Sequence, residues 1–308
     1  MPVGAWAQAQ GAPALSDLLP ARTKVRSGPP PPARDEPVQT PEPGEPIWLA
    51  VAPGDWGSAA PREIRMVLLS AARVLATAVA RPGRDVLALR VMPRSGSPRV
   101  LYERSPEGYY VVQLTARDIR WNQFAYQFAH ELCHIYSNFD HKEMHGATAD
   151  PSNQWFEEAL CEAASLHSLK AMTQAWASEA PSRNLLGYAP AFEAYAKRLL
   201  AEEHRQLPAG RSFGDWFAEH YAELRGNPYL RDKNELIATQ LLPLFERQPD
   251  LWQAIVYLNP HTASASKPFA DYLGDWHAAC PDRLKPAVAE VLALFGVLPQ
   301  APVAAHPD

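Results

Sequence analysis

Three features that this sequence lacks exclude whole classes of protein. No run of about 18 uninterrupted apolar residues occurs, so no segment is suited to cross a bilayer as a helix. Positive charge is not in excess: 29 Lys and Arg stand against 34 Asp and Glu, which leaves no electrostatic footprint for nucleic acid. The three cysteines, Cys133, Cys161 and Cys280, are too few and too far apart for a disulfide framework or a cysteine-rich zinc cluster.

Apolar residues and proline are abundant, but in different parts of the chain. Of the 308 residues 47% are hydrophobic, including 9 Trp, 11 Tyr and 10 Phe, which is ample for a large core. Eleven of the 31 prolines fall in residues 1–46, where we expect a flexible leader. Residues 3–9 are similar to the end of a secretory signal. If they are the remnant of one, the protein is periplasmic or secreted; otherwise it is cytoplasmic.

Hydrophobic periodicity predicts an α+β protein. Strand patterns cover 47–51, 86–92, 100–103 and 109–115, and the last two could form a hairpin. Helical patterns begin at 61–80 and continue, after the strands, at 121–137 and 154–178. Further helices are expected at 189–206, 212–225, 232–247 (interrupted at Pro243), 250–258, 267–278 and 283–295.

Residues 130–134 read His-Glu-Leu-Cys-His, which is an HExxH pattern. Residues four apart share one face of a helix, so His130 and His134 can offer their imidazoles to one Zn²⁺ ion. Glu131 then lies beside a metal-bound water, whose proton its carboxylate can accept. The sequence thus predicts two zinc ligands and a catalytic general base.

A third protein ligand is needed, because catalytic zinc takes three protein ligands and a water. Glu158 and Glu162 are four apart, and so on one face of the helix 154–178. With these residues the chain resembles the gluzincin metallopeptidases, the branch of thermolysin and the zinc aminopeptidases, in which a helix with Glu-x-x-x-Asp follows HExxH. The resemblance implies Glu158 as third ligand and Glu162, in place of the family's Asp, as a carboxylate hydrogen-bonded to a ligating histidine. No Gly-x-Met-x-Asn segment is present, so no single family is assigned.

Spacing alone leaves another ligand open. Asp140 occupies the third-ligand position of the metzincin pattern HExxHxxGxxD. Ser137 stands where that pattern has a turning glycine, and Asn138 could turn the chain one residue later. Glu157 lies about 100° around the helix from Glu158, and we expect it to be a solvated surface acid.

The remaining histidines and cysteines of this region have simpler interpretations. We expect His141 and His145 to be exposed loop residues, and His167 to be structural or exposed. Cys133 and Cys161 lie on the two helices that would meet at the metal. They are either buried thiols or, in an exported protein, a disulfide.

The resemblance also implies an architecture and a substrate site. Residues 47–180 would form a zincin-like core with a small N-terminal sheet, and residues 181–298 a helical C-terminal subdomain. Zincins bind an extended substrate along an edge strand before the HExxH helix, which by position is 109–115. The donor to the developing oxyanion would come from a downstream Tyr or His. The candidates are His220, Tyr221, Tyr229, Tyr257 and His261.

The sequence therefore predicts a zinc-dependent metallohydrolase, and specifically a peptidase with a peptide or protein substrate. Two alternatives stay open: an inactive zincin-fold protein with a binding or scaffolding role, and a zinc hydrolase of non-peptide amides or esters. The oligomeric state has no signal in the sequence.

Overall fold

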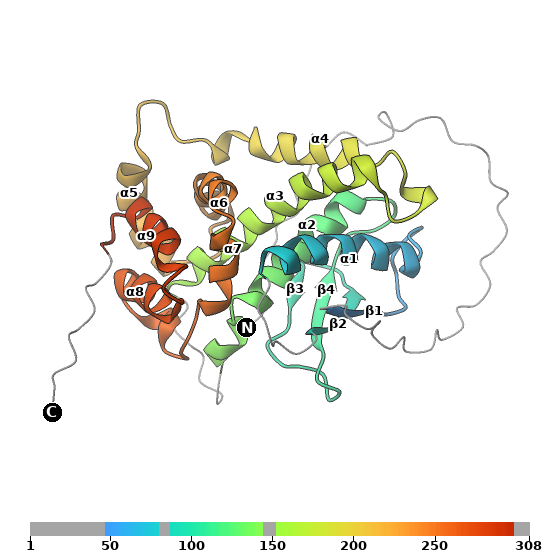
Figure 1. The fold of residues 1–308 in the computed structure, drawn as a ribbon, viewed down its shortest axis with the longest axis horizontal. Coiled ribbons are helices and arrows are strands. Elements are labelled where there is room, and N and C mark those ends of the chain that lie inside the picture. Colours follow the sequence, from blue (N-terminus) through green and yellow to red (C-terminus); the bar gives the residue numbers. More distant parts are fainter. Residues whose placement is uncertain (1–46, 80–86, 144–151, 299–308) are drawn as a thin grey trace.

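The computed structural model describes residues 47–79, 87–143 and 152–298, so the expected leader 1–46 lies outside the described residues. A small sheet lies beneath a layer of helices, and the C-terminal half of the described chain is helical (Figure 1). The α+β class predicted from the periodicity is confirmed.

The sheet has four strands in the order β1-β2-β4-β3. β1 (Ile47–Val51), β2 (Leu87–Pro93) and β4 (Tyr110–Leu114) are parallel, and the short β3 (Arg99–Val100) pairs antiparallel with β4. The expected hairpin is thus present, but the assignment of 109–115 as an edge strand is wrong. β2 pairs with one side of β4. The preceding strand β3 therefore pairs with the other side of β4 and lies at that edge of the sheet.

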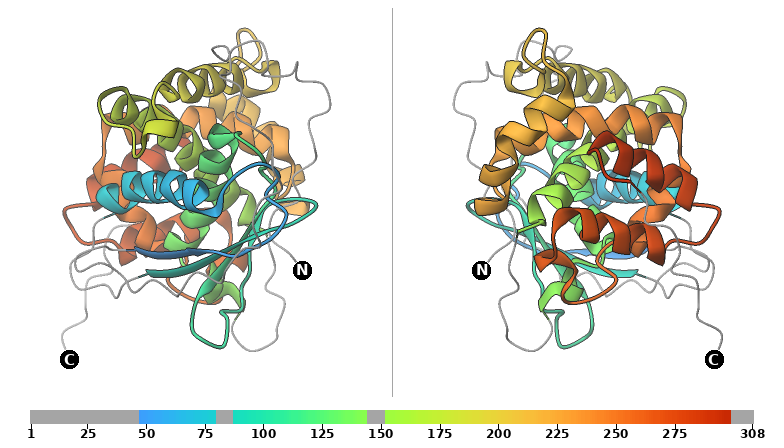
Figure 2. Two further views of the ribbon diagram at one scale, coloured as in Figure 1. Left: turned by 90° about the vertical axis from the view of Figure 1, so that its right-hand side faces the viewer. Right: turned by 90° about the vertical axis from the view of Figure 1, so that its left-hand side faces the viewer.

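Two helices lie on one face of this sheet (Figures 1 and 2). α1 (Pro61–Ala78) begins with proline in its first turn and buries a stripe that includes Ile64, Leu68 and Leu75. α2 (Trp121–Tyr136) contains the HExxH residues, and all but two of its side chains, those of Gln123 and Gln127, are buried. A helix that is buried almost all round lies in the core, and its polar residues His130, Glu131 and His134 are buried with it.

α3 (Gln154–Ser178) is the central helix of the described chain and has the predicted bounds. It contacts α1 and α2 on the side of the sheet and α4 (Ala189–Leu200) and α6 (Arg231–Arg247) on the other sides. Every side chain from Gln154 to Leu166 is buried, including three glutamates, Glu157, Glu158 and Glu162. Buried carboxylates need charged or hydrogen-bonding partners, so this segment is where chemistry is expected.

The remaining helices cover α3 and extend the fold at the C-terminal end (Figure 2). Residue 243 was expected to interrupt a helix, but α6 runs through it, because Leu242 and Phe245 on both sides are anchored in the core. η2 (Phe139–Glu143) lies between α2 and α3. The described elements after α3 are η3 (Arg183–Leu185), α4 (Ala189–Leu200), η4 (Glu203–Arg205), α5 (Phe213–Gly226), α6 (Arg231–Arg247), α7 (Asp250–Ala254), η5 (Ile255–Tyr257), η6 (Ser264–Ser266), α8 (Phe269–Ala279) and α9 (Lys285–Leu294).

Candidate metal centre

The two HExxH histidines lie side by side in the core. His130 and His134 are one helical turn apart on α2, with ring centroids separated by 4.9 Å and ring planes at 68°. Their exposures are 2% and 0%. A buried pair of imidazoles on one helix face can bind one metal ion if a third ligand approaches from another element.

Glu158 on α3 approaches both rings. Its Oε2 lies 3.2 Å from His130 Nε2, and its Oε1 lies 3.7 Å from His134 Nε2. Gln154, one turn earlier, donates a hydrogen bond of 3.1 Å to Oε1. Burial raises the pKa of Glu158, but the charge of His134 and the contact with His130 outweigh it, so the pKa is below the ordinary value. Glu158 is therefore an anion facing two imidazole nitrogens.

Two of the ligand-atom distances are close to those around a zinc ion. Zinc bonds of 2.0–2.2 Å at a tetrahedral angle separate two ligand atoms by about 3.4 Å. His130 Nε2 lies 3.2 Å from Oε2 and His134 Nε2 lies 3.7 Å from Oε1, so each histidine faces a different oxygen of Glu158. His134 Nε2 is buried and has no hydrogen-bond partner among the described residues. Two imidazoles and a carboxylate are also a donor set that zinc accepts.

Glu157 is a buried residue rather than the surface acid expected from the helix geometry. Its exposure is 0%, and its Oε1 lies 2.6 Å from His134 Nδ1. Since a carboxylate only accepts hydrogen bonds, Nδ1 carries the proton and Nε2 is left for a metal. The pKa of His134 is about 9, because the charge of Glu158 and the bond to Glu157 outweigh the lowering by burial. Without metal the ring is thus protonated at neutral pH.

Glu162 was expected to hydrogen-bond a ligating histidine, and the structure pairs it with other groups. It accepts a hydrogen bond from the hydroxyl of Tyr126 and lies 2.8 Å from Nη1 of Arg205, which is fully buried. Burial raises its pKa, but Arg205 and, further away, His130 outweigh this and hold the pKa below the ordinary value. Besides the expected ligand Glu158, the carboxylate that contacts one of the two histidines directly is Glu157, which the sequence interpretation missed.

Glu131 has the environment of a proton acceptor. It is 1% exposed, and its carboxylate accepts a hydrogen bond from the backbone N–H of Val100 in the edge strand β3. Its Oε1 has no hydrogen-bond partner in the part of the chain that the structure describes. Burial raises its pKa to about 7, against the opposing charges of His130 and His134. A carboxylate with this pKa can take up and release a proton near neutral pH.

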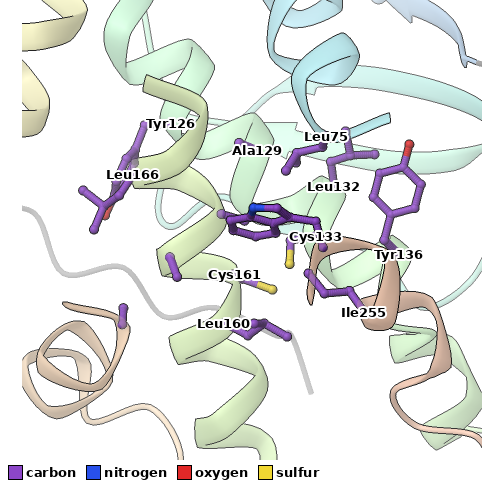
Figure 3. Packing of buried hydrophobic residues seen from close by; sticks show 14 of the residues in the cluster. Leu75, Tyr126, Ala129, Leu132, Cys133, Tyr136, Leu160, Cys161, Leu166 and Ile255 are labelled. Atoms are coloured by element: carbon purple, nitrogen blue, oxygen red, sulfur yellow. The ribbon is translucent and has the colours of Figure 1, made fainter. Parts of the chain in front are cut away.

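Cys161 is a second candidate for the third ligand. Its Sγ and one ligand atom of each histidine all lie within 4.8 Å of one another. Cys161 and Cys133 are buried free thiols where α2 meets α3 (Figure 3). Burial, followed by the hydrogen bond with Cys133, raises the pKa of Cys161 well above its ordinary value. Cys161 would have to lose a proton to bind metal, whereas Glu158 is already an anion.

Of the other sequence candidates, Asp140 and His167 contact other groups, and His145 lies outside the described residues. In the metzincin alternative Asn138 turns the chain, and its φ is indeed 56°. Asp140, the ligand of that alternative, instead accepts a hydrogen bond of 2.9 Å from the Tyr110 hydroxyl and lies 3.5 Å from Arg104. His167 is a structural residue whose ring lies 4.6 Å from that of Trp252.

Among the candidate oxyanion donors, Tyr229 is electrostatically linked to the site. Burial raises its pKa to about 12, and the charges of Glu158 and Glu157 add to this effect. Its hydroxyl has no hydrogen-bond partner among the residues described. Tyr221, by contrast, packs against the rings of Phe217 and Trp155.

A second cluster of possible metal ligands is an ion-pair network. Glu202, His204 and Glu235 lie close enough together to hold an ion. The guanidinium of Arg205 lies 3.1 Å from each of the two carboxylates, and Arg231 Nε lies 2.5 Å from Glu235. Because these arginines neutralise the carboxylates, the cluster needs no metal.

No family model matches this chain, and no curated protein matches it. Within the described ranges, no helix combines the length and the apolar character that a membrane span requires. The candidate site therefore stands on its own geometry: two imidazoles, a carboxylate facing both, and a buried acid beside them.

Proposed function

We propose that the protein is a zinc-dependent hydrolase of the zincin type that cleaves peptide bonds. His130, His134 and Glu158 would hold the metal, and zinc, when bound, lowers the pKa of a coordinated water and polarises a carbonyl. The observation that carries the proposal is the convergence of one carboxylate on two Nε2 atoms at 3.2 and 3.7 Å.

The residues around the ligands supply the other parts of a hydrolytic site. Glu131, with its pKa near 7 and one oxygen without a described partner, would accept the proton of the attacking water and pass it to the leaving amine. The Tyr229 hydroxyl would donate to the developing oxyanion. The edge strand β3, whose Val100 N–H binds Glu131, would pair with an extended substrate.

The arrangement of the elements supports the zincin type. The HExxH helix α2 covers a small sheet whose antiparallel strand forms one edge, and α3 brings Glu158 to α2. The gluzincin resemblance implies the same order of a sheet, an HExxH helix and a helix with the third ligand.

Turnover tests this proposal. The zinc-loaded protein and its Glu131→Gln variant are incubated with a peptide library and with panels of esters and non-peptide amides, and the products are identified by mass spectrometry. Peptide cleavage by the wild type alone supports a peptidase. Turnover of esters or non-peptide amides alone would mean that the enzyme is a hydrolase but not a peptidase. No turnover of any substrate by the zinc-loaded wild type would contradict the proposed hydrolase activity.

A second candidate function follows from the position of Cys161. With Cys161 as a fourth protein ligand the site would be closed, as in structural zinc sites, and the protein would be an inactive zincin-fold binding or scaffold protein. Glu131 is buried, and its Oε1 has no hydrogen-bond partner among the described residues. This favours the open site, because a closed site holds no metal-bound water whose proton Glu131 could accept. Cys161→Ser distinguishes the two: an open site keeps its zinc affinity, and a closed site loses it.

A further inference from the structure

Two asparagines join the C-terminal end of α2 to the chain that follows η5. Asn138 and Asn259 both have a left-handed backbone, with φ of 56° and 51°. The Asn138 amide donates to the carbonyl oxygens of Val256 and Leu258, each at 2.8 Å, and the Asn259 amide donates to that of Ser137 at 2.9 Å. The pair is thus a reciprocal latch between the helix that carries both histidines and the C-terminal helices.

Asn259 has an additional contact that leads to the metal centre. Its Nδ2 donates to Glu157 Oε2 at 2.7 Å, and the other oxygen of Glu157 lies 2.6 Å from His134 Nδ1. The hydroxyl of Tyr272 in α8 donates to Asn259 Oδ1 at 3.1 Å, which fixes the end of the amide that faces Glu157. These four side chains are at most 1% exposed.

We propose that Asn259 is a positioning residue of the metal centre, acting through Glu157 on His134. This inference rests on the zinc site proposed above. Both oxygens of a buried carboxylate need donors, and Asn259 supplies the donor for Oε2 while His134 supplies the one for Oε1. Without Asn259, Oε2 of Glu157 loses this donor, and the hydrogen bond that sets the orientation and tautomer of His134 weakens.

The inference makes the C-terminal helices part of a centre whose proposed ligands all lie between residues 130 and 158. Tyr272 and Asn259 are more than 100 residues from Glu157, and the chain of hydrogen bonds from α8 to His134 forms only when these helices are in place. Metal affinity should therefore respond to substitutions far from the ligands in sequence.

Asn259→Gly and Asn138→Gly form a matched pair for the test. Glycine adopts positive φ without strain, so each variant removes one half of the latch and keeps the backbone conformation. Only Asn259→Gly removes a donor from Glu157. Zinc affinity is measured on the full chain by competition with a chromophoric chelator, and the melting temperature of each metal-free variant is recorded.

We expect Asn259→Gly to weaken zinc binding about 10- to 100-fold. Asn138→Gly should leave the zinc affinity unchanged, although it lowers the melting temperature by about as much as Asn259→Gly does. In a Glu157→Gln background, Asn259→Gly should add little further loss, because both changes break one chain of contacts. Equal losses of affinity in the two glycine variants, or full additivity with Glu157→Gln, would overturn the inference.

Tyr272→Phe is the milder variant should Asn259→Gly fail to fold. It keeps the ring and removes only the hydroxyl that orients the Asn259 amide. A smaller loss of zinc affinity in the same direction is expected, and an unchanged affinity would contradict the inference. A wild type that binds no zinc would instead contradict the proposed metal centre itself.

Discussion

Replacing Glu157 by glutamine tests how the site holds His134. Each oxygen of Glu157 faces a donor: His134 Nδ1 at 2.6 Å and Asn259 Nδ2 at 2.7 Å. Glutamine has one oxygen and one NH₂ group, so one donor must then face another. Asn259 cannot turn to relieve this, because its amide also donates to Ser137 and accepts from Tyr272.

The size of the effect follows from the hydrogen bond that holds His134 Nδ1. When zinc takes the lone pair of Nε2, the proton of the ring is at Nδ1 and needs an acceptor. The glutamine oxygen can accept from His134 or from Asn259 but not from both, so either the bond that orients the ligand or the bond to Asn259 is lost. One unmade buried hydrogen bond costs about 1–3 kcal/mol, and we expect a loss of zinc affinity of about 10- to 100-fold.

The assay is chelator competition with Glu157→Gln at fixed pH. Asp140→Asn is the control, since this carboxylate also follows the HExxH residues but contacts Tyr110 and Arg104 instead of a histidine. Zinc affinity should be unchanged in Asp140→Asn. Glu157→Gln with wild-type affinity, or a larger effect in Asp140→Asn, would refute the proposed role of Glu157.

Three further predictions concern stability, pH and turnover. Arg205→Met leaves buried Glu162 without its guanidinium partner, so urea denaturation should show a loss of about 3–5 kcal/mol; a loss below about 1 kcal/mol would mean that this ion pair is not important. The metal-free protein should lose stability as pH rises, on the order of 3 kcal/mol for each of Glu131 and His134. The folded state raises the pKa of Glu131 from 4.5 to about 7 and that of His134 from 6.5 to about 9. Each contribution is complete below the ordinary pKa of the group and is lost as pH rises through the pKa in the folded state. A denaturation midpoint that does not decrease as the pH is raised from 5 to 9 would contradict this. Tyr229→Phe should lower kcat about 100-fold with little change in KM, and an unchanged kcat would exclude Tyr229 as oxyanion donor.

Much of the framework was predictable from the sequence. Periodicity predicted α2 to within one residue and α3 at its full bounds, because long helices with a continuous apolar pattern leave a strong local signal. The four-residue spacing of HExxH predicted that the two histidines share a helix face, and the gluzincin resemblance pointed to Glu158. The structure brings these three side chains together.

The errors arose where burial depends on distant elements. The prediction of a solvated position for Glu157 is wrong, because only a helix packed on one side has a solvated face, whereas α3 is enclosed by α1, α2, α4 and α6. Glu162 pairs with Arg205 in η4, 43 residues further along the chain, and no local pattern predicts such a partner. Asn259 is recognisable only once the structure shows its contacts. The edge position of β3 likewise depends on the order of strands, which their sequences do not contain.

The absorption spectrum of the cobalt-substituted protein shows whether α2 and α3 build an open centre of two histidines and Glu158. We expect visible bands of a nitrogen–oxygen site without an intense near-ultraviolet thiolate band, and a changed spectrum in Glu158→Gln. A thiolate-to-cobalt band that disappears in Cys161→Ser, with no response to Glu158→Gln, would contradict it.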